Sequence, residues 1–510
     1  MKMLNRLILF SFILAFGIVS CDNITNINQP GNLPSEDALE NVDDLELALP
    51  GLYSNLDVYD LVYFNSVRTD EIAPGPGNGG QGLGGQYQFV LNTTSAISAT
   101  AWNSGYSSID EINRFINSSS EIDPGDSEDL YNDLLGQAHA MRAFEYFKLT
   151  SLYSEDITDN SSMGVVVSTE VQDRKVKPTR NTTGETFSQI LADIQKAENK
   201  IDPSLGPASN ATRFTLPALT ALKARIAAYR KNYERADSLS QVIIDNHALA
   251  GPADYQSMFG EDTQGEVLMK LERTLGDPYE GQAAIGTPAG SGFIGNIYAQ
   301  VAFYRGVHYH VEQSLVDLYP GNDIRSRTNY FPDSGLPANL QNGPFNYVYK
   351  YSGGVEGEDT PLLNDQKLFR VSEMYLINAE AKAATGDLPG AAQRIFELRS
   401  ARTFAAPGPS LPSYANQQEA FADILVERRK ELAFEGHRWF DLRRMGPVAG
   451  VTIDRDETVT GIGGCNQYDA CVGPDPAQDS EKYVLPIPQN ELNANPNIKQ
   501  NPGYGGGAGS

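Results

Sequence analysis

The sequence is poor in the residues on which metal centres, disulfide frameworks and nucleic-acid contacts depend. It holds 3 cysteines, 5 histidines and 2 tryptophans among 510 residues. Basic residues number 39 against 65 acidic ones, which gives a formal net charge of −26 at pH 7. This charge argues against binding to nucleic-acid phosphates and to anionic lipid headgroups. Because 40% of the residues are hydrophobic and 20% are charged, the composition is typical of a folded globular chain.

Long apolar runs are also scarce, and the clearest one lies at the N-terminus. Lys2 and Arg6 form a short positive region. The apolar run that follows, Leu7–Val19, is too short to span a bilayer and fits a secretory signal. It leads into Ser20-Cys21, and a small residue before a cysteine at this place resembles a bacterial lipobox. We therefore predict a lipoprotein signal peptide over residues 1–20 and lipidation of Cys21. Ordinary secretory cleavage near Ser20 is the alternative.

The segments that surround the cysteines are irregular. Residues 21–37 are polar and contain Asn, Pro and Gly, which predicts a flexible tether. Cys465 and Cys471 lie in the loop-like stretch GIGGCNQYDACVGP. In an exported, oxidising compartment these two cysteines are predicted to form a disulfide. Zinc binding is the weaker alternative, since no histidine is near and two thiolates do not complete a tetrahedral site. No metal site and no cofactor are predicted.

Apolar residues at helical spacing predict a mainly helical chain. The expected helices include residues 38–56, 102–116, 129–153 and 183–201. Gly164–Val167, GVVV, is predicted to be a short buried strand. Ala73–Phe89 is rich in glycine and is predicted to be a surface loop. It lacks the Lys-Ser/Thr ending of a P-loop, which argues against a phosphate site.

Two helix pairs further along the chain resemble each other. The first pair is expected at 216–229 and 234–245, and the second at 369–384 and 389–400, with Thr385-Gly386-Asp387 as its turn. When the pairs are aligned, small or apolar residues coincide at three positions: Ala224 with Ala379, Ala236 with Ala391, and Ile243 with Leu398. This spacing favours degenerate tetratricopeptide repeats over unrelated hairpins, because small residues let paired helices approach closely. Residues 250–366 lie between the pairs and are predicted to be a functional insertion or irregular subdomain.

The stretch ERRKELAFEGHRWFDLRRM, Glu427–Met445, combines charge with a histidine and a tryptophan. Glu427, Glu431 and Glu435 are spaced to share one helix face and need cations to offset their repulsion. The arginines expected to supply them are Arg399, Arg402, Arg438, Arg443 and Arg444. The spacing Glu435-Gly436-His437 does not match a metal-binding HExxH helix, and the chain contains no GxSxG nucleophile elbow. We therefore predict a structural role, with Gly436 ending the helix and Trp439 and Phe440 as apolar anchors.

This charged stretch resembles the C-terminal hallmark of the SusD/RagB family of outer-membrane lipoproteins. YVLPIPQNELNANPNIKQNPGY, Tyr483–Tyr504, is similar to the closing motif of that family. RVSEMYLINAEAKAATGD, GQAHAMRAFEYFKL and GLYSNL also fit the family pattern, in the same order. The resemblance implies a single SusD-like domain over residues 38–510: four tetratricopeptide-like helix pairs with long irregular loops and small strands. It also implies no catalysis, and a role in capturing nutrients for a SusC-like TonB-dependent transporter.

The ligand site is then expected on the irregular loops, where flat aromatic faces can stack on sugars. The candidates are Tyr87 and Phe89 beside the glycine-rich segment, and Tyr279, Phe293, Tyr298, Phe303, Tyr304 and Tyr309 in the insertion. For each of these, packing beneath a loop is the alternative. The predicted function is capture of oligosaccharides at the cell surface by a protein lipid-anchored in the outer membrane. Peptide capture is an alternative ligand class, and a surface glycosidase or a tetratricopeptide adaptor is a less favoured function.

Overall fold

The computed structural model describes most of the chain beyond the predicted tether. The described residues are 39–75, 86–173, 175–207, 211–274, 294–298, 309–332, 345–351, 364–455 and 480–505. The predicted signal peptide and tether, Cys21, and the predicted disulfide between Cys465 and Cys471 lie outside these residues. They therefore stay predictions.

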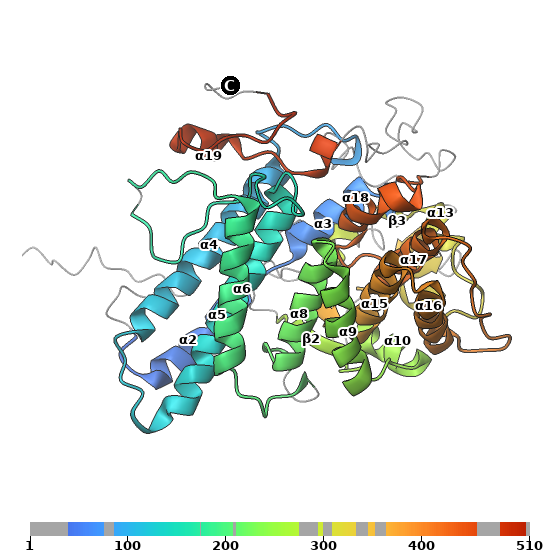
Figure 1. The fold of residues 1–510 in the computed structure, drawn as a ribbon, viewed down its shortest axis with the longest axis horizontal. Helices are drawn as coiled ribbons and strands as arrows, with labels where there is room; N and C mark the ends of the chain where they lie inside the picture. Colours follow the sequence, from blue (N-terminus) through green and yellow to red (C-terminus); the bar gives the residue numbers. More distant parts are fainter. Residues whose placement is uncertain are drawn as a thin grey trace, which may run out of the picture.

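Helices dominate the structure and lie side by side from α4 at the left of Figure 1 to α16 at the right. The long helices are α2 (Val42–Asn55), α3 (Tyr59–Arg68), α4 (Ala96–Ser119), α5 (Glu128–Tyr153), α6 (Thr183–Lys200), α8 (Leu216–Tyr229), α9 (Tyr233–Asn246), α15 (Val371–Thr385), α16 (Leu388–Arg402), α17 (Gln417–Glu431) and α18 (Arg438–Ala449). Shorter ones are α10 (Pro252–Gly260), α11 (Gly295–Tyr298), α13 (Gln313–Val316), α14 (Arg325–Thr328) and α19 (Gln489–Ala494). The mainly helical fold class is confirmed.

Consecutive helices pack in pairs, α5 with α6, α8 with α9, α15 with α16, and α17 with α18. The small residues aligned in the sequence, among them Ala224, Ala379, Ala236 and Ala391, are fully buried. The second predicted pair also contacts the first, because Asn378 on α15 donates to the Asp237 carboxylate of α9 at 2.7 Å. The two predicted pairs thus form one continuous stack.

Local sequence signals define the ends of several helices. Asn41 and Asp44 form a reciprocal capping box at the start of α2, and Thr182 and Glu185 form another at the start of α6. Gly386 ends α15 with φ +92°, a left-handed conformation that glycine adopts without steric cost. α4 begins earlier than predicted, at Ala96, because Ile97 and Ala101 continue its buried face.

The predicted strand at Gly164–Val167 is wrong, because the segment is extended but does not join a sheet. Its backbone groups are bound by side chains as well as by neighbouring backbone. The Tyr106 hydroxyl contacts both the N–H and the carbonyl of Val166 at 2.9 Å. The amide oxygen of Asn181 accepts from the N–H of Val167 at 2.9 Å. These contacts satisfy the backbone without the ladder that a strand requires.

The described parts of the insertion form the short helices α10, α11, α13 and α14 and several small strands. β1 (Ile72–Pro74) pairs with β3 (Tyr309–Val311), β2 (Val267–Leu271) with β6 (Gln366–Arg370), and β4 (Tyr330–Pro332) with β5 (Asn346–Val348), all antiparallel. Ala73 and Pro74, which were predicted to begin the glycine-rich loop, belong to β1 instead. The insertion is therefore tied by its strands to segments far away in the sequence.

The C-terminal segment returns to the N-terminal half of the chain. The Leu485 N–H donates to the carbonyl of Leu152 on α5 at 2.8 Å. The Trp439 indole N–H donates to the carbonyl of Tyr483 at 3.0 Å.

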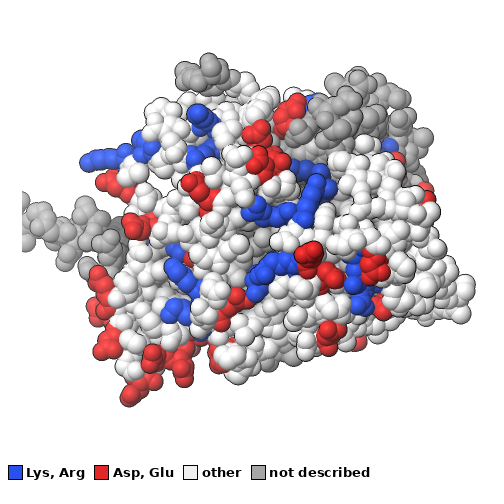
Figure 2. All heavy atoms as spheres, in the orientation of Figure 1, with Lys and Arg blue, Asp and Glu red and all other residues white. Residues whose placement is uncertain are grey.

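Acidic side chains gather at the lower left edge of the face shown in Figure 2, where Figure 1 shows α2 and the start of α5. The negative charge therefore has a clear concentration on this face.

Candidate functional site

The charged C-terminal motif changes direction between α17 and α18. α17 carries Glu427 and Glu431 and ends at Glu431, so that Glu435 lies in the following turn rather than on the helix as predicted. Phe434 has φ +65° and Gly436 has φ +83°. These two residues with left-handed backbone conformations turn the chain before α18. This conformation is unfavourable at Phe434, because a residue other than glycine rarely adopts a positive φ. The helix therefore stops before Gly436, the residue predicted to end it.

Glu431 is the centre of a buried set of ion pairs. Its carboxylate accepts from Arg402 Nε at 3.0 Å, from Arg370 Nη1 at 2.8 Å and from Arg325 Nη1 at 3.1 Å. Burial by itself would raise the pKa of Glu431, but the three guanidinium groups hold it well below its usual range. Because removal of one charge would leave the others buried and unpaired, this arrangement has the character of a scaffold.

Two of the predicted arginines belong to this network. Arg399 Nε contacts Glu427 at 2.7 Å and Arg402 contacts Glu431. The other three bind elsewhere: Arg438 pairs with Asp70 at 2.7 Å, Arg444 pairs with Asp441 at 2.9 Å, and Arg443 donates to the carbonyl of Ser154 at 3.0 Å.

Lys430 of the motif itself pairs with Glu427 at 2.8 Å, and three further cations of the network come from segments that sequence reasoning missed. Arg325 begins α14, Arg370 ends β6, and Lys350 follows β5. Arg370 and Lys350 both contact Glu435, at 2.7 and 2.6 Å. Each is distant from the glutamates in the sequence, and no local spacing rule links them. The packing of the insertion and of β6 against α17 and the turn that follows it brings them together.

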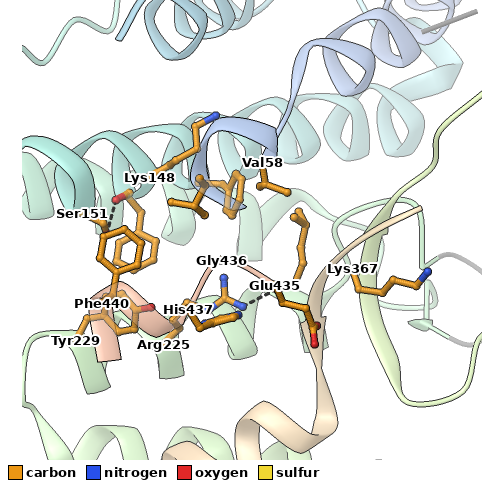
Figure 3. Close-up of a pocket in the computed structure, with 14 residues that line it drawn as sticks. Val58, Lys148, Ser151, Arg225, Tyr229, Lys367, Glu435, Gly436, His437 and Phe440 are labelled. Atoms are coloured by element: carbon orange, nitrogen blue, oxygen red, sulfur yellow. Dashed lines mark hydrogen bonds between the residues drawn. The ribbon is translucent and has the colours of Figure 1, made fainter. Parts of the chain in front are cut away.

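A small cavity lies behind the turn, lined by His437, Glu435 and Gly436 together with Ser151, Lys148 and Arg225 and several aromatic rings (Figure 3). Its volume is about 30 Å³, enough for water but far below the several hundred Å³ of a typical ligand pocket. Ser151 Oγ donates to the carbonyl of Phe147 at 2.8 Å, and Glu435 accepts from Arg370 and Lys350. These hydrogen bonds of Ser151 and Glu435 thus go to residues other than His437.

His437 itself is held in its neutral form. Burial is the main cause that lowers its pKa well below the usual range, and nearby arginines, among them Arg225 and Arg428, lower it further. Among the described residues, no nucleophile or carboxylate is hydrogen-bonded to His437, and a neutral histidine that lacks such a partner is not arranged for general acid–base catalysis. The geometry agrees with the structural interpretation of the motif.

The predicted ligand-binding aromatics fall into three groups. Tyr279, Phe293, Phe303 and Tyr304 lie outside the described residues. Tyr298 and Tyr309 are each only 1% exposed. The Tyr298 hydroxyl contacts Ser66 Oγ at 2.9 Å, and its ring meets Phe434. Because both tyrosines are buried in the core, neither presents the exposed ring face that stacking on a sugar requires.

Tyr87 and Phe89 form the third group and are half-buried beside the glycine-rich segment. The Arg455 guanidinium lies 3.8 Å from the ring centre of Tyr87 and 4.8 Å from that of Phe89. Phe89 also stacks on Trp439 with ring centres 6.1 Å apart. Arg68 lies 4.3 Å from the Trp439 ring centre, so cations and aromatic rings alternate through this cluster. The structure thus brings two of the predicted aromatics together at the edge of the core.

Glu71 is a buried carboxyl group that follows α3. It accepts from the Phe434 N–H at 3.1 Å and from Ser66 Oγ at 2.7 Å. No lysine, arginine or histidine among the described residues forms an ion pair with it. Burial raises the pKa of Glu71 to about 7.

We expect Glu71→Gln to stabilise the protein at pH 8. The raised pKa means that the folded state resists ionisation of Glu71. The resulting loss in the free energy of unfolding begins above the ordinary pKa of 4.5 and is complete above about 7. Glutamine keeps an acceptor for Phe434 and removes the charge. Urea unfolding should show a gain of about 1–3 kcal/mol at pH 8 and almost none at pH 4. An equal gain at both values would show that ionisation is not the cause.

Among the described ranges, no helix is both long and apolar enough to cross a membrane. The same ranges contain no group of three or more histidine, cysteine, aspartate or glutamate side chains placed to hold a metal ion.

Two protein-family models match the chain, one in each half. The model described as "SusD family" matches residues 293–504, and the one described as "Starch-binding associating with outer membrane" matches residues 51–227. Curated relatives include two SusD-like proteins of Formosa agariphila. P38 is 26% identical, with 89% of this chain and 95% of P38 covered. P2 is 24% identical, with 96% and 98% covered.

Solved structures share the fold at low sequence identity. A SusD superfamily protein from Bacteroides thetaiotaomicron has a TM-score of 0.73 at 24% identity, with 91% of this chain and all of that chain covered. A protein described as a putative sugar binding protein from Bacteroides vulgatus has a TM-score of 0.70 at 24% identity, with 92% of this chain and all of that chain covered. At this identity the likeness establishes the fold alone.

Proposed function

We propose that the chain is a SusD-family protein that captures oligosaccharides at the bacterial cell surface and delivers them to a SusC-like TonB-dependent outer-membrane transporter. The observation that carries the proposal is the pair of family matches, which together span both halves of the chain. One of these families is described as starch-binding and associated with the outer membrane. The solved neighbours include a putative sugar binding protein and a SusD-like carbohydrate binding protein.

The geometry of the charged motif supports binding rather than catalysis. Its carboxylates are held by arginine and lysine, and His437 is neutral and enclosed. A glycosidase would need two carboxyl groups facing each other across a cleft that admits a sugar. The small cavity behind the motif is too narrow for that reaction. The motif is therefore proposed to act as the frame that holds the ligand-binding loops.

Six aromatic residues remain candidates for contact with the ligand: Tyr87, Phe89, Tyr279, Phe293, Phe303 and Tyr304. Isothermal titration with neutral oligosaccharides and with peptides tests the ligand class, and saturable binding of oligosaccharides alone is expected. Alanine at a residue that stacks on the sugar should then cost about 1–3 kcal/mol of affinity, by analogy with stacking on nucleic-acid bases. Binding of peptides alone would contradict the proposed ligand class. Unchanged affinity in all six variants would place the site elsewhere.

The proposed anchor is a lipid on Cys21. Metabolic labelling with a fatty acid should mark the wild-type protein, and the wild type should fractionate with the outer membrane. Cys21→Ala removes the thiol that would be acylated and should abolish the label. Multiple acyl chains make such an anchor stable, whereas a single chain is marginal. Equal labelling of both proteins would contradict the anchor.

A further inference from the structure

Helix α2 contains an interior Pro50-Gly51 pair that its own packing does not explain. Proline removes the hydrogen bond to the carbonyl of Glu46 and is strongly unfavourable in a helix interior, and glycine is less favourable there than alanine. Both residues are exposed, and a Cβ added at Gly51 would meet nothing within 4 Å. A local rule broken without a packing reason is typical of a functional surface.

A groove of about 580 Å³ lies against this part of α2. Pro50 and Tyr53 line it on the helix side, Leu271 and Glu272 at the end of β2 line it on another, and Arg213 also faces it. Figure 1 shows α2 and β2 in the lower part of the molecule, away from α18 and β3. We call this surface the α2 groove. Its volume falls within the range of small-molecule sites, in contrast to the cavity at His437.

The aromatic ring in the groove is held rigidly. The Tyr53 hydroxyl donates to Gln137 Oε1 at 2.5 Å and accepts from the Phe214 N–H at 2.9 Å. The Tyr53 ring also stacks on Phe214, with ring centres 6.5 Å apart and an angle of 29° between the planes. Because these contacts fix the ring before any ligand arrives, binding to its free surface loses little side-chain entropy.

The charges in the groove favour hydroxyl groups over anions. Glu46 and Glu272 are exposed and supply carboxylate acceptors. Arg213 Nη2 is bound to Asp133 Oδ2 at 3.0 Å, so its charge is already balanced. Its Nε is buried and is therefore not offered to the groove. A phosphate, sulfate or carboxylate would meet two anions here, whereas the hydroxyls of a neutral sugar find two acceptors.

We propose that the α2 groove binds a segment of a neutral oligosaccharide. The C–H face of a sugar ring lies over Tyr53 and Pro50. Its hydroxyls donate to the carboxylates of Glu46 and Glu272. The inference rests on the proposed function and adds a glycan-binding surface whose lining does not include Tyr87 or Phe89.

Tryptophan substitutions on α2 test the α2 groove directly. Pro50→Trp places an indole in the groove and restores a helical N–H, whereas Leu47→Trp adds the same group at an 80% exposed position that does not line the groove. The probes are neutral α- and β-linked oligosaccharides of glucose, xylose and mannose, titrated calorimetrically. For the tightest-binding probe, Pro50→Trp should weaken binding at least about tenfold, and Leu47→Trp should leave it unchanged.

The outcomes separate the two proposals. Wild-type affinity and stoichiometry in Pro50→Trp would overturn the α2 groove while leaving the proposed function intact. Equal losses in both tryptophan variants would also overturn it, because the effect would not depend on filling the groove. If the wild type binds none of the oligosaccharides, the proposed function fails and the α2 groove fails with it. Circular dichroism on each variant confirms that the helices are retained.

Discussion

Replacing Glu431 with alanine is expected to lower the free energy of unfolding by about 3–5 kcal/mol, because it leaves Arg325, Arg370 and Arg402 buried without their shared carboxylate. Urea unfolding at pH 7 measures the loss. The pKa of Glu431 is held below its usual range, so its stabilisation is present above the ordinary pKa of 4.5 and is lost as the pH falls through the folded-state value.

Glu234→Ala is the matched control for this prediction. Glu234 is exposed at the start of α9, so its loss should cost less than about 1 kcal/mol. Folded Glu431→Ala protein should bind ligand as the wild type does, because the carboxylate is buried in the scaffold. Loss of ligand affinity at unchanged stability would instead place Glu431 in the binding site.

Trp439→Ala is expected to cost about 3–5 kcal/mol through the cavity that it opens. The indole is fully buried, and its ring centre lies 4.5 Å from that of Tyr483 and 5.7 Å from that of Phe64. The Trp439 ring also contacts the Arg68 guanidinium, whose Nε and Nη1 have no hydrogen-bond partner among the described residues. Burial lowers the pKa of Arg68 to about 10, so this guanidinium remains charged at neutral pH and depends on the ring.

Thermal and urea unfolding of Trp439→Ala and Trp439→Phe together test this prediction. Phenylalanine keeps an aromatic face for Arg68 and should recover part of the loss. Leu47→Ala, at an exposed position, should be nearly neutral. If Trp439→Ala has the same stability as the wild type, the contact between Trp439 and Tyr483 does not hold the C-terminal segment Tyr483–Tyr504 to the core.

Local patterns in the sequence were sufficient for most of the long helices, but not for α3 and α18 and not for the contacts between distant segments. The repeat of Ala224 and Ala236 at Ala379 and Ala391 identified two helix pairs because small residues mark close helix contacts. The run GVVV satisfied strand propensity, yet the Tyr106 hydroxyl and the Asn181 side chain bind its backbone in place of a strand. Propensity does not include such partners, which only tertiary packing supplies.

The charged motif shows the same limit. Arg399 and Arg402 could be predicted as partners because they lie near the glutamates in the sequence. Arg325 and Arg370 could not, since each reaches Glu431 through the packing of a different segment. The candidate site was predicted from aromatic composition, which does not distinguish the buried Tyr298 and Tyr309 from exposed rings.

The central claim is the proposal that this chain captures glycans and does not cleave them. The most direct test titrates the purified protein with neutral oligosaccharides, incubates it with the tightest-binding one and analyses that glycan by chromatography. The account predicts saturable binding and recovery of the glycan at its original length. Absence of saturable binding by every glycan, or recovery of shortened products in amounts that grow with time, would contradict it.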